Sequence, residues 1–428
     1  MRILIYTCNY YPEPIGIAPL VTELAEGLAQ RGHRVRVVTS LPNYPERRIY
    51  PPYRRRWFTR EVRNGVLVQR SYAWVRPQPS ALSRLLFEIS FLLSSLGHVL
   101  MGERPDVIFL TVPPLIASLA VMLLSKVYRC PVILNLQDIL SEAVAQLALL
   151  PQAWMVHPLK KLENLAYHAA TVVSVITEGF AETLQARGVP AQKLVCIPNW
   201  VDTRFIHPLP RQATTFRRLH QLEGKFVALY AGNIALTQGI ETLLEAACLL
   251  QNVPDILILI VAEQRARHRI AAYCRQRHIR NVRLLPFQSR ENLPVLLSAA
   301  NVGLVLQKRQ VVSFNLPSKT QTLLAGGLPV IASVPLDGIA AQTIRRSGAG
   351  VIVPPEQPDL LADALHQLML NPAQVQVLSR QGRAYVEQNH DLRQALDQYE
   401  ALFYELTGQR SPRPVLSPIP VEPTRDSR

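Results

Sequence analysis

Cysteine is scarce in this 428-residue chain and forms no recognisable framework. There are five cysteines, an odd number, and no two of them stand as a Cys-x-x-Cys pair. Disulfide-stapled domains and structural zinc sites both depend on suitably spaced cysteines. The sequence therefore predicts a reduced, cytoplasmic protein without a disulfide framework or a zinc site. The first residues, Met1–Thr7, are typical of a short buried strand and not of a signal peptide.

Three ligand-binding motifs are also missing. No Gly-x-Gly-x-x-Gly follows a first strand, which removes the main support for a nicotinamide-dependent dehydrogenase. No Gly-x-x-x-x-Gly-Lys-Ser/Thr occurs, which excludes a P-loop nucleotidase. No Asp-x-Asp occurs and the histidines show no metal-ligand spacing, so we expect no metal site.

Acidic residues are few, 31 against 46 Lys and Arg, and the formal net charge is +15. The excess lies in segments 47–76 and 264–290, which hold nine and eight Arg, with one acid in the first and none in the second. Such patches favour an anionic partner, although a solvated basic face remains the alternative. Segment 47–76 also contains Tyr, Trp and Phe, which favours an anionic membrane surface, and no nucleic-acid-binding motif accompanies it.

Long hydrophobic runs are limited to two. The run Val107–Val127 is divided by Pro113 and Pro114, so we predict a parallel strand followed by a packed helix instead of a membrane span. The run Leu82–Val99 predicts a mostly buried helix that touches a bilayer with one face.

Apolar strand patterns alternate with helical ones along most of the chain, and the alternation restarts after a proline-containing linker near 199–210. This pattern predicts an α/β protein with two Rossmann-like doubly wound domains that face each other across a cleft. We place them at 1–205 and 206–390, followed by a helix at 391–407 that crosses back to the first domain and a Pro-rich disordered tail at 408–428. The predicted strands of the first domain are Ile3–Thr7, Val35–Thr39, Val66–Arg70, Val107–Thr111, Val132–Asn135, Val172–Val175 and Leu194–Ile197.

Ligands of such domains bind at the carboxyl ends of the strands, so the residues found there are the candidates. Gly16 precedes a long helix and would let backbone N–H groups approach an anion, unless it is an ordinary loop glycine. Ser318 is a good helix N-cap, and Lys319 in the first turn opposes the helix dipole unless an anion lies there. The strand, turn and helix of Tyr230–Glu241 offer a second loop for phosphate, and Asp138 either orients a hydroxyl or caps a helix.

Together these residues resemble glycosyltransferase family 4, and within it the colanic-acid-type exopolysaccharide fucosyltransferases. The resemblance extends from Met1 to about Leu406. It is carried by Asn9–Ala18, Arg31–Val35, Gln137–Asp138, Ile197–Asp202, Tyr230–Glu241, Pro317–Lys319 and Gly327–Val330.

The resemblance implies the GT-B fold and transfer of a sugar, usually with retention of configuration, from a UDP- or GDP-sugar to a hydroxyl group. It implies a lipid-linked or oligosaccharide acceptor in surface polysaccharide or lipopolysaccharide biosynthesis, no tightly bound cofactor, and a cytoplasmic enzyme that is peripheral at the inner face of the cell membrane. Lys319 and Asp138 would be catalytic. The donor would be bound by Gly16, Gly232, Asn233, Gln238, Glu263, Phe287, Ser318, Lys319 and Thr322, and the acceptor by Tyr10, Asp138 and Glu142.

The chain departs from the family pattern at several of these positions. Phe314 and Thr322 stand where many members have two glutamates, and Asn233 and Gln238 stand where many have Arg and Lys. These departures keep two alternatives open: a non-catalytic binding subunit, and a sugar-nucleotide epimerase on the same fold.

Overall fold

The computed structural model describes residues 1–77, 80–112, 115–146, 156–209, 215–234, 237–311, 316–410 and 419–420. The chain divides into two compact units: unit 1 comprises residues 1–199 and 392–428, and unit 2 comprises residues 200–391. The sequence predicts these boundaries at 205/206 and 390/391.

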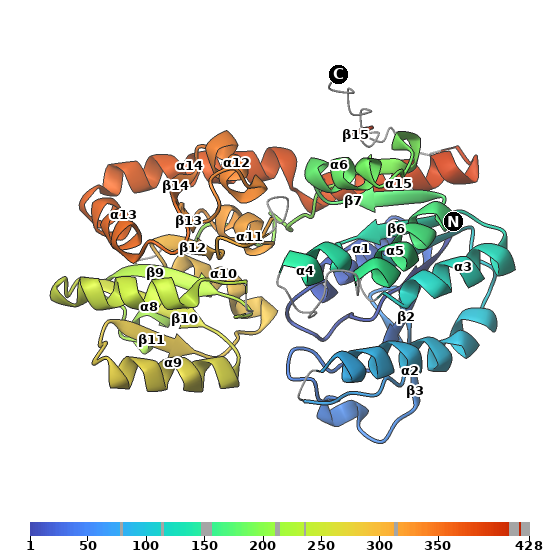
Figure 1. Ribbon diagram of the computed structural model, residues 1–428, viewed down its shortest axis with the longest axis horizontal. Coiled ribbons are helices and arrows are strands. Elements are labelled where there is room, and N and C mark those ends of the chain that lie inside the picture. Colours follow the sequence, from blue (N-terminus) through green and yellow to red (C-terminus); the bar gives the residue numbers. More distant parts are fainter. Residues whose placement is uncertain are drawn as a thin grey trace. The chain divides into compact units, whose positions relative to one another are not determined.

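Unit 1 is built on a nine-stranded sheet with the order β15-β8-β7-β6-β5-β1-β2-β4-β3 (Figure 1). All neighbouring pairs are parallel except β3–β4 and β15–β8 at the two edges. The central strands are buried along their whole length, because helices cover both faces of the sheet. The strands are β1 (Arg2–Tyr6), β2 (Arg34–Ser40), β3 (Phe58–Arg63), β4 (Val66–Ser71), β5 (Val107–Val112), β6 (Val132–Leu136), β7 (Val172–Val175), β8 (Leu194–Cys196) and β15 (Ile419–Pro420).

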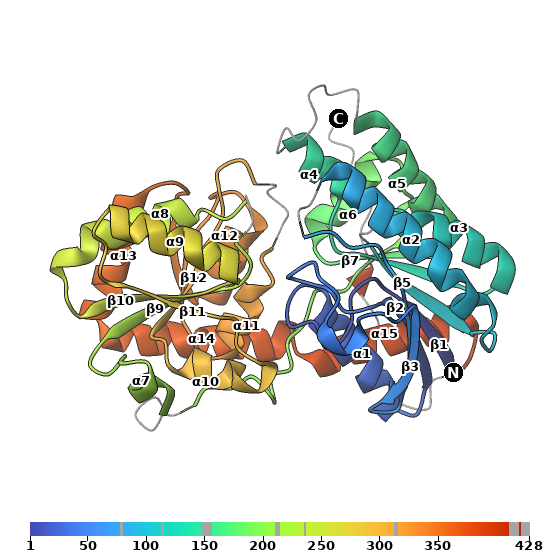
Figure 2. The ribbon, with the colours of Figure 1, turned by 90° about the horizontal axis from the view of Figure 1, so that it is seen from below.

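One face of this sheet is covered by α1 (Ala18–Gln30) and α15 (Leu392–Thr407), and the other by α2 (Ala81–Leu100), α3 (Ala117–Tyr128) and α5 (His157–Ala169) (Figure 2). The last helix, α15, is tied into this core by polar contacts. Its Tyr399 hydroxyl lies 3.0 Å from Asn135 Nδ2 and 3.0 Å from Ser174 Oγ. Its buried Glu400 accepts from Arg31 at 2.7 Å and lies 2.9 Å from His33 Nε2.

The arginine-rich segment 47–76 differs from expectation, because part of it is internal. Its residues 58–63 form β3, an edge strand that the sequence did not predict. Arg70 is completely buried and paired with Glu61, and Arg63 is paired with Glu26. These two arginines therefore contribute to the fold through ion pairs.

The helix α2 also differs from expectation, because only 22% of its apolar stretch is buried. Phe91, Ser95 and Val99 lie inside, against the sheet, whereas Leu82, Leu85 and Leu93 are among its exposed side chains. Among the described helices α2 alone is long and apolar enough to cross a membrane by length and composition. The other hydrophobic run is divided into β5 and α3, as predicted; residues 113–114 lie outside the described residues.

Unit 2 contains a six-stranded, fully parallel sheet with the order β11-β10-β9-β12-β13-β14. The strands are β9 (Phe226–Ala231), β10 (Ile256–Val261), β11 (Val282–Leu285), β12 (Val302–Leu306), β13 (Val330–Ser333) and β14 (Gly350–Val353). One apolar cluster joins this sheet to α8 (Ile240–Leu249), α9 (Gln264–Gln276) and α13 (Pro358–Leu370). A second cluster joins it to α10 (Leu293–Ser298), α11 (Lys319–Ala325), α12 (Ile339–Ser347) and α14 (Pro372–Asn389).

The two parallel-sheet units confirm the predicted α/β fold class. The sequence missed the short helices α4 (Leu140–Gln146) and α7 (Thr215–Leu219), and also α12. In the region expected to be a disordered tail, Ile419–Pro420 pairs with β8 as the short strand β15. Residues 411–418 and 421–428 of that tail lie outside the described residues.

Candidate functional site

A lysine, a glutamine and a tyrosine come together in unit 2, where β9 ends. Lys319 begins α11, and its Nζ lies 3.9 Å from the centroid of the Tyr230 ring. The same Nζ donates a hydrogen bond of 3.1 Å to Gln238 Oε1. The Tyr230 hydroxyl lies 3.2 Å from Gln238 Oε1 and 3.2 Å from the Asn233 carbonyl oxygen. Three predicted donor-binding residues, Lys319, Gln238 and Asn233, therefore form one cluster with Tyr230.

Gly232 brings bare backbone to this cluster. Its φ of +144° is a conformation that side-chain-bearing residues rarely adopt. A Cβ placed there would lie 3.5 Å from both Cε and Nζ of Lys319. The glycine thus leaves the amine bordered by the main chain, which is the arrangement that a phosphate group needs for close approach.

The Lys319 side chain is half-buried, and its electrostatic state is set by the loss of hydration at the amine. Loss of hydration lowers the pKa of its amine to about 7. Burial also raises the pKa of Tyr230, which keeps the phenol under the amine neutral. In the described part of the chain, no carboxylate lies within ion-pair distance of this amine. An anionic ligand would supply the missing negative charge.

The remaining donor candidates of unit 2 lie at the same edge of its sheet. Glu263 follows β10 and Phe287 follows β11, and both strands run parallel to β9. Thr322 lies one turn along α11 from Lys319. Ser318 occupies the N-cap position but makes no capping bond, contrary to expectation, because its backbone is itself helical (φ −57°, ψ −23°).

In unit 1 the loop after β1 is held by a buried carboxylate. Glu13 accepts hydrogen bonds from the Asn43 and Tyr44 backbone N–H groups, at 2.7 and 2.8 Å, and from Asn9 Nδ2 at 2.7 Å. Burial raises the pKa of Glu13, and these three bonds oppose that rise. Gly16 follows in this loop with φ +74°, two residues before the start of α1.

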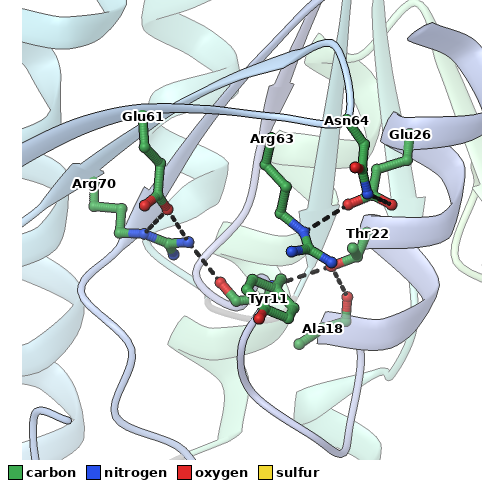
Figure 3. Close-up of polar contacts among 8 residues, drawn as sticks. All are labelled: Tyr11, Ala18, Thr22, Glu26, Glu61, Arg63, Asn64 and Arg70. Atoms are coloured by element: carbon green, nitrogen blue, oxygen red, sulfur yellow. Dashed lines mark hydrogen bonds and ion pairs between the residues drawn. The ribbon is translucent and has the colours of Figure 1, made fainter. Parts of the chain in front are cut away.

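The two tyrosines of this loop have different surroundings. Tyr10, predicted to bind the acceptor, is buried, with Arg70 Cζ 6.0 Å from the centroid of its ring. Its neighbour Tyr11 is 40% exposed and lies under the guanidinium of Arg63, with 3.4 Å from Cζ to the ring centroid (Figure 3). Tyr11 is thus the more accessible of the two rings.

The strand pair β3–β4 holds Tyr11 in place (Figure 3). Arg70 donates to Glu61 Oε1 through Nε and Nη2, at 2.9 and 2.7 Å, and to the Tyr11 carbonyl at 2.6 Å. The Thr22 hydroxyl accepts from the Tyr11 N–H at 3.0 Å. The loop that carries Tyr10 and Gly16 is therefore fixed to the arginine-rich pair of strands, a connection that nothing local in the sequence signals.

Asp138 and Glu142 follow β6 in unit 1, and their pKa values are shifted in opposite directions. Burial raises the pKa of Asp138, a hydrogen bond from the Ile139 N–H lowers it, and the charge of Glu163 raises it further. Glu142 was expected to contact the acceptor, but it is hydrogen-bonded to Arg187 and lies 3.4 Å from Lys160 Nζ. Although burial raises the pKa of Glu142, these two cations lower it overall. Glu142 is thus part of an internal ion-pair network.

Within the described ranges, no group of three or more His, Cys, Asp or Glu side chains is placed to hold a metal ion.

Known sequences resemble both halves of the chain. Residues 16–200 match the family described as a glycosyl transferase 4-like domain, and residues 212–385 match glycosyl transferases group 1. The colanic acid biosynthesis glycosyl transferase WcaI of Escherichia coli is 32% identical over 407 residues, covering 93% of this chain and 98% of its own. The glycosyltransferase WbjE of Pseudomonas aeruginosa is 23% identical, covering 73% and 75%.

Solved structures share the fold. Sucrose-phosphate synthase of Thermosynechococcus elongatus has a TM-score of 0.73 at 18% identity, covering 95% of this chain and 99% of its own. HepE of Anabaena, solved in complex with UDP-glucose, has a TM-score of 0.71 at 17% identity, covering 95% and 100%. Both are similar to this chain in having two parallel-sheet α/β domains of the GT-B type.

Proposed function

Because this chain belongs to the glycosyltransferases that combine a 4-like domain with a group 1 domain, we propose that it transfers a sugar from a nucleotide-sugar donor to a saccharide hydroxyl during polysaccharide assembly. The observation that carries the proposal is the cluster of Gly232, Gln238 and Lys319 at the ligand-binding edge of the unit 2 sheet. UDP-glucose bound to HepE supports a nucleotide sugar as ligand, here a UDP- or GDP-sugar.

The chemistry follows from where charge develops. As the bond between the sugar and the diphosphate breaks, negative charge collects on the departing phosphate oxygens. In its ammonium form Lys319 stabilises that charge, and its burial strengthens the interaction. In unit 1, Asp138 is our candidate for the group that accepts a hydrogen bond from the acceptor hydroxyl. We propose retention of configuration at the transferred sugar.

One experiment tests the enzyme and identifies the donor. Purified protein is given a panel of UDP- and GDP-sugars, with and without a lipid-linked saccharide acceptor, and release of nucleoside diphosphate is measured. The proposal expects release that depends on acceptor with one or a few donors. Binding without turnover of any donor would favour the non-catalytic subunit. An isomerised nucleotide sugar formed without acceptor would favour the epimerase.

The acceptor proposal rests on the surface of unit 1. Beside β3 the chain exposes Trp57 and Phe58, at 65% and 53%, next to the exposed Arg54–Arg56. The helix α2 adds exposed leucines, and its Phe58–His98 ring contact joins it to β3. Arginines with aromatic rings suit the interface of an anionic bilayer, and an apolar helix face adds a shallow contact.

A lipid-linked acceptor is present only at a membrane, so an enzyme that uses one must reach it. We therefore propose a cytoplasmic protein that is peripheral at the inner face of the cell membrane, with Arg54–Arg56, Trp57, Phe58 and the outer face of α2 as its contact.

A further inference from the structure

We propose that the nucleotide sugar is bound together with one proton, which the amine of Lys319 takes up as the diphosphate arrives, and that Tyr230 and Gln238 are the positioning residues that hold this amine. The inference rests on the proposed donor site and adds how that site changes its charge.

The contacts of the amine explain why it is ready to accept a proton. Its Nζ lies over the neutral Tyr230 ring and 3.1 Å from Gln238 Oε1, a neutral amide oxygen. The Gln238 amide is itself fixed by the Tyr230 hydroxyl at 3.2 Å. These contacts favour a cation through the ring's π-system and the amide dipole, but they bring no negative charge to it.

In the described ranges, the elements packed against α11 bring no acid to the amine either. β12 and β13 carry no titratable side chain. The titratable groups of α14 are Arg380, Arg383, Tyr385 and Glu387. Arg383 donates to the carbonyl of Ala325 at the other end of α11 and pairs with Glu387. Lys308, which follows β12, has its Nζ 3.7 Å from Glu241 Oε2.

The charge state follows from these surroundings. Burial lowers the pKa of Lys319 to about 7, so near neutral pH the amine is divided between its neutral and charged forms. A diphosphate placed against it raises that pKa, because the charged form gains an opposite charge. Ligand binding then converts Lys–NH2 to Lys–NH3⁺ with a proton from solvent. By linkage, affinity falls as the pH rises above the pKa of the free protein.

Calorimetry measures this proton directly. UDP-glucose is titrated into the whole protein at pH 7 and pH 8, each in two buffers that differ in heat of protonation. UDP-glucose is chosen because its diphosphate is esterified at both ends, and GDP-mannose serves as the second probe. We expect uptake of about half a proton at pH 7 and about 0.9 at pH 8, with binding about fivefold weaker at pH 8.

Three variants test whether the proton is taken up by Lys319 or by another titratable group. Gln238→Glu places a carboxylate against the amine and keeps it charged, so uptake at pH 7 should fall near zero. Lys319→Arg carries a permanent charge and should also abolish uptake. Lys225→Gln is the matched control, because its Nζ bonds the Pro254 carbonyl beside the opposite end of β9. It should leave uptake unchanged.

The outcomes distinguish the inference from the proposed function. If UDP-glucose or GDP-mannose binds with the same heat in both buffers at both pH values, the proton is not taken up and the inference is wrong, while the donor site stands. If uptake persists unchanged in a folded Lys319→Arg, another group titrates and the inference is also wrong. If neither these two nor any other member of the UDP- and GDP-sugar panel binds, the proposed function fails and the inference fails with it.

Discussion

At the scale of single residues, Lys319 is the position where function and folding should separate most clearly. Lys319→Ala removes the charge that we propose contacts the leaving diphosphate, so turnover should fall by about 30- to 1000-fold. Because the amine has no acidic partner in the described structure, melting temperature should not fall with it. Steady-state kinetics and thermal melting check both, with Lys225→Gln as control. Unchanged kinetics in a folded variant would make Lys319 an ordinary surface-adjacent lysine.

Replacement of Asp138 by Asn should raise the stability of the protein and lower its activity. The pKa of Asp138 is raised in the folded protein, so stability falls as the pH rises from the pKa of the unfolded state to that of the folded state, and the loss is complete above it. Asp138→Asn keeps the oxygen that accepts from Ile139 and removes the charge. At neutral pH we expect the melting temperature to rise by about 2–4 °C.

Turnover of Asp138→Asn should fall by about 10- to 150-fold, the value of one hydrogen bond to a charged group. Unchanged turnover together with unchanged melting would assign Asp138 to helix capping, since Asn caps as well as Asp.

Individual site residues can be predicted from the sequence, but contacts between residues that are far apart along the chain cannot. Gly232 and Gln238 could be selected because they lie in the loop after a predicted strand, and Lys319 because a cation in the first turn of a helix implies an anion there. The ring of Tyr230 could not be assigned to Lys319, since nothing local links the two. The pairing of Glu142 with Arg187 could not be predicted, because Arg187 comes from a distant helix end.

At the scale of elements, replacement of Arg70 in the strand pair β3–β4 should lower the stability of the protein, whereas replacement of the exposed Arg60 should not. Arg70→Lys cannot keep the two bonds to Glu61 and the bond to the Tyr11 carbonyl. The free energy of unfolding should fall by about 1–3 kcal/mol. We expect a value at the lower end of this range, because the Glu61 side chain is 38% exposed. Chemical denaturation measures it, and Arg60→Lys, exposed on β3, is the control. Equal stability of the two variants would contradict a structural role for Arg70.

The elements themselves could be predicted where their burial pattern was simple. β5, β6 and β7 begin at the residues that the sequence predicts and end within one residue of the predicted position, because each is a short, mainly apolar run. β3 was missed because its inward side carries Thr59, Glu61 and Arg63, so the strand looks like part of a charge cluster. Here ion pairs replace the apolar face on which periodicity depends.

At the scale of the whole molecule, sedimentation with liposomes tests the membrane proposal. Binding should increase with anionic lipid and decrease with salt. Replacing Arg54, Arg55 and Arg56 with Ser should weaken it by about 100-fold, at about 1 kcal/mol per arginine. Replacing the exposed Arg269, Arg275 and Arg280 of unit 2 with Ser changes the net charge equally and should weaken binding much less.

The remaining outcomes of that experiment are informative. Equal loss in the two triple variants would mean that overall charge, and not the surface of unit 1, drives binding. Binding that resists salt and is reversed only by detergent would mean that α2 is inserted. No binding at any lipid composition would contradict a peripheral membrane protein.

The position of α15 in unit 1 has a consequence for synthesis on the ribosome. Tyr399 and Phe403 complete a core whose other members lie before residue 200, so that core is unfinished while all of unit 2 is translated. At about 5–20 residues per second, this interval lasts about 10–40 s. During it, the apolar surface that α15 will cover stays open to chaperones. A chain that ends at residue 391 should therefore contain a folded unit 2 together with an incomplete, protease-sensitive unit 1.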